Sequence, residues 1–177
     1  MEGLDAALKG AGVYEYGIVR PEDAPFSIEV HKMCEANRCG QYGKTWVCPP
    51  GIGTLAECEA RLKAFERMIV FSVKYDLEDS FDFEGMEAGM KDFKEVSRRV
   101  DGAVGAIVGM HLTLSNEGCG LCASCTYPDA PCRFPERSHG SIEAYGIFVN
   151  QLAKTAGINY INGQNTVTYF GALLFNH

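Results

Sequence analysis

The cysteines constrain this chain more than any other feature. There are eight: Cys34, Cys39, Cys48, Cys58, Cys119, Cys122, Cys125 and Cys132. Cysteines two residues apart in a tight turn suit a shared metal or cluster better than separate cross-links. The N-terminus shows no basic region followed by an apolar run, so we expect no export signal and a cytoplasmic protein with reduced thiols. Metal or cluster binding is therefore favoured, with a disulfide framework as the lesser alternative.

Length and charge restrict the class of protein further. A chain of 177 residues predicts one domain, spanning residues 1–177. The 16 basic and 23 acidic residues give a net charge of −7, which suits neither nucleic-acid binding nor docking on anionic lipid. The longest apolar runs reach about eight residues, whereas a membrane-spanning helix needs ~20. We therefore expect no nucleic-acid partner and no membrane partner.

Helical and strand patterns alternate along the chain. Helices are predicted over 4–11, 54–67, 85–100 and 142–156, and strands over 14–19, 26–30, 68–73, 110–114, 158–161 and 167–175. Thr54 and Glu57 form a capping-box pattern, and the Asn-Gly-containing segment 162–165 predicts a hairpin between the last two strands. The expected fold is a single α/β or α+β domain. It has a mixed β-sheet, about three helices and two cysteine-rich metal-binding loops, at 34–50 and 118–135.

The second cysteine segment, residues 118–135, has the spacing of an iron–sulfur site. Cys119, Cys122 and Cys125 follow the C-x2-C-x2-C pattern of bacterial cluster ferredoxins. Three thiolates at this spacing can converge on three irons of one cube. Cys132 comes six residues later, so it can close the same cube or reach another. Zinc bound by four thiolates is the alternative, although a run of three is less typical of zinc, and a purely structural knuckle also stays open.

The first cysteine segment, residues 34–50, has the weaker pattern C-x4-C-x8-C-P-P. Cys34, Cys39 and Cys48 could hold a second cube whose fourth ligand is Cys58, Cys132 or none. Cys58 lies in a predicted helix, where a lone cysteine is more often a small buried apolar residue, so it is only a possible ligand. With three cysteines, one iron would stay open as a Lewis acid, which is the route to an enzyme.

Several polar residues near the two segments are candidates for supporting roles. His31, His111 and His139 could be ligands or proton donors, although satisfied surface or core histidines are more common. Arg38, Lys44 and Arg133 could raise the reduction potential of a negatively charged cluster, or could pair with carboxylates. No catalytic residue is assigned. Lys44, Arg38 and His31 would be tested first if the chain is an enzyme.

The two segments together resemble a known family, the domain of unknown function 2284, whose members are described as metal-binding proteins of bacteria and archaea. The residues that carry the resemblance are Cys34, Cys39, Tyr42, Gly43, Trp46, Cys48, Pro49, Pro50, Cys119, Cys122, Cys125, Pro131, Cys132, Arg133, Pro135, Ser141, Ala144, Tyr145, Gly146 and Ile147. The resemblance covers roughly residues 30 to 150. It implies cytoplasmic iron–sulfur or metal binding by all the cysteines except Cys58, and it implies no substrate.

Three functions follow as hypotheses. The first is an electron-transfer protein with one or two [4Fe–4S] clusters and a redox partner that has a basic face. The second is a small enzyme that uses a three-cysteine cluster with an open iron. The third is a structural zinc-binding interaction module. A homodimer formed through the C-terminal hairpin is also possible.

Overall fold

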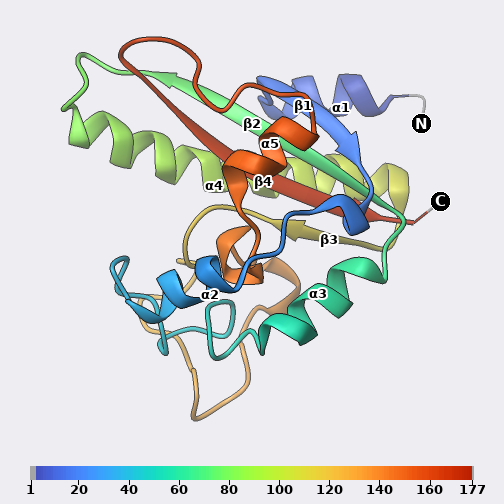
Figure 1. Cartoon of the computed structure of the whole chain (residues 1–177), viewed down its shortest axis with the longest axis vertical. Coiled ribbons are helices and arrows are strands. Elements are labelled where there is room, and N and C mark those ends of the chain that lie inside the picture. The colour runs from blue at the N-terminus through green and yellow to red at the C-terminus, as the bar shows by residue number, and fades with distance from the viewer. Residues whose placement is uncertain (1–2, 177) are drawn as a thin grey trace.

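A computed structural model, which describes residues 3–176, contains one four-stranded sheet. Its strands are β1 (Glu15–Val19), β2 (Arg67–Asp76), β3 (His111–Leu114) and β4 (Thr166–Phe175). Their order across the sheet is β1-β2-β4-β3, and every neighbouring pair is antiparallel (Figure 1). β2 and β4 pair over ten residues from Arg67 opposite Phe175 to Asp76 opposite Thr166, so these two strands form the centre of the fold.

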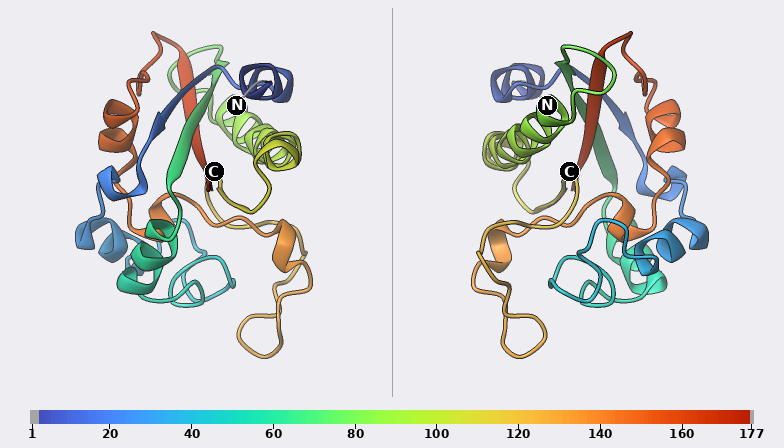
Figure 2. Two further views of the ribbon diagram at one scale, coloured as in Figure 1. Left: turned by 90° about the vertical axis from the view of Figure 1, so that its right-hand side faces the viewer. Right: turned by 90° about the vertical axis from the view of Figure 1, so that its left-hand side faces the viewer.

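One face of the sheet is covered by α1 (Leu4–Ala11) and α4 (Phe83–Val108), as Figure 2 shows. Alternate residues of β2, including Ile69 and Phe71, point to this face, as the two-residue period of a strand requires. The Phe71 ring stacks on Phe93 of α4 with a centroid distance of 5.8 Å. This layer is therefore an apolar core made by helix and strand residues far apart in the sequence.

The opposite face carries α3 (Leu55–Lys63), α5 (Val149–Thr155) and irregular segments, with α2 (Ile28–Glu35) beyond them (Figures 1 and 2). Met68 and Val70 of β2 belong to this second core, together with Leu62 of α3 and Leu152 of α5. Thr54 accepts a hydrogen bond from the Glu57 N–H while the Glu57 carboxylate accepts from the Thr54 N–H. The capping box predicted from the sequence is confirmed.

The predicted class, a single domain of helices and strands, is confirmed, but its sheet differs from the expected one. The sheet is antiparallel throughout instead of mixed, because β4 lies between β2 and β3, which run in the same direction. The described residues form five α-helices where about three were expected. α4 continues eight residues beyond the predicted end at residue 100, and its small Gly105 packs against the His111 ring.

Three local predictions are wrong. The segment 26–30 is not a strand: Phe26 forms one isolated bridge with Ile147, and α2 begins at Ile28. The helix predicted over 142–156 is divided into a short 3-10 helix and α5, because Gly146 adopts a left-handed φ of 75°. Residues 158–161 form no strand, since β2 and β3 already occupy both edges of β4. The predicted C-terminal hairpin is therefore absent from the described residues.

The two cysteine segments lie at the same end of the molecule, below the sheet in Figure 1. The second segment leaves the sheet after β3 and returns at Ser141, where Ser115 and Ser141 form a parallel bridge. The Ser115 N–H donates to the Gly140 carbonyl at 2.8 Å, which closes this long loop at its base. Among the described residues, no helix is both long and apolar enough to cross a membrane.

Candidate metal centre

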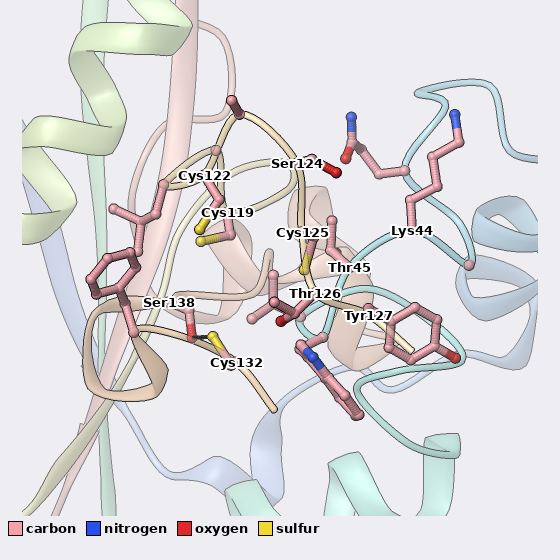
Figure 3. A pocket seen from close by; sticks show the side chains of 18 residues that line it. Lys44, Thr45, Cys119, Cys122, Ser124, Cys125, Thr126, Tyr127, Cys132 and Ser138 are labelled. Atoms are coloured by element: carbon pink, nitrogen blue, oxygen red, sulfur yellow. Dashed lines mark hydrogen bonds between the residues drawn. The ribbon is translucent and has the colours of Figure 1, made fainter. Parts of the chain in front are cut away.

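The thiols of the second segment surround one cavity. This cavity, hereafter the thiol pocket, has a volume of about 500 Å³. Figure 3 shows the sulfur atoms of Cys119, Cys122, Cys125 and Cys132 around a common space. The structure thus brings together all four cysteines that the sequence placed in this segment. A single zinc ion needs its four sulfurs about 2.3 Å away, so a pocket of this size has room for a much larger group.

Backbone N–H groups converge on Cys125. The amides of Tyr127, Trp46 and Thr126 face its sulfur, and Arg133 adds a positive charge. Burial alone would raise the pKa of the Cys125 thiol, but these donors and this charge outweigh burial and hold the pKa below its ordinary value. Arg133 is fixed by a hydrogen bond of 2.9 Å that it donates to the Ser124 carbonyl. This arrangement stabilises a thiolate, which is the form that binds a metal.

The other thiols of the pocket differ in environment. Burial raises the pKa of the Cys119 thiol, the nearby Cys132 and Cys122 raise it further, and the Leu121 amide and Arg98 oppose the rise. The Cys132 sulfur lies 3.8 Å from the Ser138 hydroxyl oxygen. Cys119 is therefore a site where negative charge is costly without a cation.

Three cysteines of the first segment form a second group. Cys34 lies in the last turn of α2, Cys39 is exposed, and Cys48 is buried. Burial raises the pKa of the Cys34 thiol to about 11, and the neighbouring Cys39 and Cys48 add to the rise. The Cys34 sulfur lies 3.9 Å from the carbonyl oxygen of Glu143. The three thiols predicted to act together thus influence one another in the fold.

The two groups are adjacent through Cys48 and Cys119. Burial raises the pKa of the Cys48 thiol, Cys39 and Cys119 raise it further, and Thr45 and Lys94 oppose these effects. Trp46, two residues before Cys48, lines the thiol pocket and packs edge-on against Tyr127 at a centroid distance of 4.9 Å. The first segment therefore forms one wall of the pocket that the second segment's thiols surround.

Cys58 lies away from both groups. It lies in α3 and is fully buried in the core, and its sulfur is 3.9 Å from the Ile52 carbonyl oxygen. Arg61 and Glu57 act on its thiol, and no other cysteine among the described residues does so. This position is that of a small apolar core residue, the more common interpretation of a lone helical cysteine.

The pocket wall fits a bound group with many acceptor atoms. The hydroxyl of Thr45 is buried on this wall and faces the Cys48 thiol, where it opposes the rise in pKa that burial causes. Within the same residues, no three His, Cys, Asp or Glu side chains are grouped closely enough to hold one metal ion. A thiolate-ligated iron–sulfur cluster would be held by the four cysteines of the second segment, with Thr45 and the Cys125 amides as donors to sulfur.

The histidines and basic residues near the two cysteine segments differ in their distance from the thiol pocket and in their exposure. Lys44 lines the thiol pocket, whereas Arg38 is exposed. The Nδ1 atom of His31 is buried without a partner among the described residues. The Nε2 atoms of His111 and His139 lie 3.1 and 3.4 Å, respectively, from the Oδ1 atom of Asp101.

Sequence reasoning missed the contribution of α4 to the site. Lys94 donates a hydrogen bond of 2.8 Å to the Gly118 carbonyl, and Arg98 acts on Cys119. Ser97 lies between them on the same helical face and accepts a hydrogen bond from Ser115. The spacing of these residues, three and four positions apart, is the only signal that could have indicated one polar stripe along the helix.

Comparisons with known proteins place these features in context. A family model described as "Predicted metal-binding protein (DUF2284)" matches residues 17–175. No curated protein matches the chain. Among solved structures, an epoxyqueuosine reductase from Streptococcus thermophilus is similar, with a TM-score of 0.46 and 13% sequence identity. The match covers 97% of this chain but only 44% of that one, so this chain spans less than half of the reductase's length.

Proposed function

The chain belongs to the DUF2284 family of predicted metal-binding proteins, and on that premise we propose that it is an iron–sulfur protein that transfers electrons. The thiol pocket would hold a [4Fe–4S] cluster on Cys119, Cys122, Cys125 and Cys132. Such a cluster, when bound, supplies a one-electron redox couple. The chain's own residues bind it, exclude water and adjust its charge environment.

One observation carries this proposal. Four thiols from a single segment surround a cavity of about 500 Å³, and three of them have the ferredoxin spacing. A cluster spreads its ligands over several irons, whereas zinc draws all four sulfurs to one point. The amides around Cys125 add the hydrogen bonds to sulfur that are known to adjust cluster potentials.

A second centre and a partner complete the proposal. Cys34, Cys39 and Cys48 would hold the second cluster, and this cluster would lie next to the first, because Trp46, two residues before Cys48, lines the thiol pocket. The net charge of −7 suits a redox partner with a basic face. Eight unpaired cysteines fit a reducing compartment such as the cytoplasm.

A second function, catalysis at an open iron, is favoured by the first cysteine group. That group has three thiols, and Cys58, which could have been its fourth ligand, lies in the core instead. A cluster held by three cysteines leaves one iron free to bind a substrate. Cys34 would stand at this site beside the Glu143 carbonyl.

The test is metal analysis of protein purified without oxygen. We expect about eight iron and eight sulfide per chain for two clusters of four irons, with a visible band that bleaches with dithionite. Cys119→Ser should lower the iron content by about half, while Cys58→Ala, the matched control, should retain all of it. A change in the EPR spectrum on adding cyanide would favour the open iron over simple electron transfer.

Two results would contradict these proposals. A colourless protein with stoichiometric zinc and no sulfide would refute both iron–sulfur functions and leave the structural zinc module. Unchanged iron in Cys119→Ser would show that the ligand assignment is wrong.

A further inference from the structure

Next to the thiol pocket, basic side chains line a second, small cavity. This cavity has a volume of about 10 Å³, and Cys119 lines both it and the thiol pocket. Its basic residues, hereafter the cation cluster, are Lys94, Arg98, Arg137 and His139. None of the described residues that line it carries a carboxylate. In a chain with a net charge of −7, four basic groups around one cysteine are not expected from composition.

The charges of the cation cluster are not equally available. Arg98 forms an ion pair with Glu95, and the His139 imidazole lies 3.4 Å from the Asp101 carboxylate. Lys94 forms no ion pair with any carboxylate in residues 3–176. Its ammonium is held by the Gly118 carbonyl at 2.8 Å, and carbonyl contact does not neutralise a charge. Lys94 thus directs an uncompensated positive charge toward the start of the second cysteine segment.

Lys94 also lies close to the turn between Cys119 and Cys122. Its ammonium is 3.6 Å from the position that a Cβ on Gly120 would take, so it sits directly against the 119–122 turn. The half-buried side chain is partly shielded from water, where a charge acts more strongly than on an open surface.

We propose that Lys94 is a positioning residue that fixes the start of the second cysteine segment and raises the reduction potential of the centre bound there. This inference rests on the proposed function. A one-electron reduction, with the electron supplied by the redox partner, adds a negative charge to the thiol pocket and makes or breaks no bond. Lys94 does not line this pocket, but it lies against the 119–122 turn that forms part of the pocket wall. A fixed cation at this place favours the reduced state.

The decisive measurement is the reduction potential, determined by dye-mediated titration of anaerobic protein. Lys94→Gln removes the charge and keeps an amide that can still donate to Gly118. It should shift the reduction equilibrium about tenfold toward the oxidised state, or ~59 mV for a one-electron couple. Lys94→Arg keeps the positive charge, so its reduction potential should be close to that of the wild type. Lys91→Gln is the matched control, because Lys91 is on the same helix, is 69% exposed and pairs with Glu87.

A second measurement separates failure of this inference from failure of the proposed function. In metal-free, reduced protein, Lys94→Met, which cannot donate to the Gly118 carbonyl, should show faster amide hydrogen exchange in residues 118–122 than wild type or Lys91→Gln. If the wild type holds no iron, the proposed function fails, and the exchange rates still decide whether Lys94 fixes this segment. Equal potentials in fully loaded Lys94→Gln and Lys91→Gln, or equal exchange rates in metal-free Lys94→Met and wild type, would overturn the inference.

Discussion

The indole nitrogen of Trp46 donates a hydrogen bond of 3.0 Å to the carbonyl oxygen of Ala130, which lies 84 residues further along the chain. The contact joins the two cysteine segments directly, because Trp46 lies two residues before Cys48 and Ala130 lies two residues before Cys132. It acts together with the edge-on packing of Trp46 against Tyr127. The shape of the thiol pocket therefore depends on both segments, although all four of its cysteines come from one.

Substitution of Trp46 should reveal this dependence. Trp46→Phe loses the hydrogen bond but keeps a ring against Tyr127, so we expect a loss of about 1 kcal/mol in the free energy of unfolding and nearly full iron content. Trp46→Ala removes both contacts and should lose about 2 to 3 kcal/mol, with less iron retained after desalting. Denaturant unfolding and iron analysis measure these effects. An alanine variant with wild-type stability and iron would contradict the role assigned to Trp46.

Cys58 should tolerate loss of its sulfur but not gain of a polar group. Its side chain is fully buried among apolar residues. Cys58→Ala should keep its iron and cost about 1 kcal/mol of stability, since it removes a small buried side chain. Cys58→Ser should also keep its iron but cost more, about 2 kcal/mol, because it buries a hydroxyl. Loss of iron in both variants would show that Cys58 supports a metal centre after all.

Asp101 should make stability depend on acid pH. Burial raises the pKa of its carboxyl, but the neighbouring polar side chains of His139 and Thr113 and the charges of His139 and His111 lower it more, to about 2. The folded pKa is below the ordinary 3.8, so the unfolded chain binds more protons. The resulting stability, about 2 kcal/mol, is present above about pH 4 and is lost as the pH falls toward 2.

The variant Asp101→Asn tests this relationship. At neutral pH it should be less stable than wild type by about 2 kcal/mol, and the difference should shrink as the pH falls below about 4. Asp76→Asn serves as the control, because the Asp76 side chain is 80% exposed and should change little at any pH. A constant difference between Asp101→Asn and wild type at all pH values would rule out the lowered pKa as its cause.

Gly17 in β1 is a position where no side chain fits. A Cβ there would collide with the Ala156 carbonyl oxygen, immediately after α5. Gly17→Ala should therefore push α5 away from the sheet and cost about 2 kcal/mol or more. Gly10→Ala, in the exposed last turn of α1, should stabilise the protein by up to about 1 kcal/mol. Thermal unfolding of both variants gives the comparison, and similar melting temperatures would disprove the close approach at Gly17.

Much of the local structure could be predicted because its causes lie within a few residues. The α1 helix has the predicted bounds, and the Thr54–Glu57 capping box begins α3 as expected. The apolar run 68–73 lies within β2 because both faces of that strand are covered. The separation of the cysteines into two segments, and the spacing within each, follow directly from the order of residues. Metal binding is therefore a property that the sequence by itself indicates.

The tertiary structure alone decided which distant groups meet. The adjacency of Cys48 and Cys119, the contact of Lys94 with Gly118, and the burial of Cys58 in the core all depend on packing across the sheet. The prediction of a strand at 158–161 was wrong for the same reason. An apolar pattern shows that a segment can form a strand, but it does not show whether a neighbouring strand has a free edge with which to pair. The spacing of apolar residues along the sequence indicates which face of a helix or strand is buried. Which other element packs against that face depends on the tertiary structure of the whole chain.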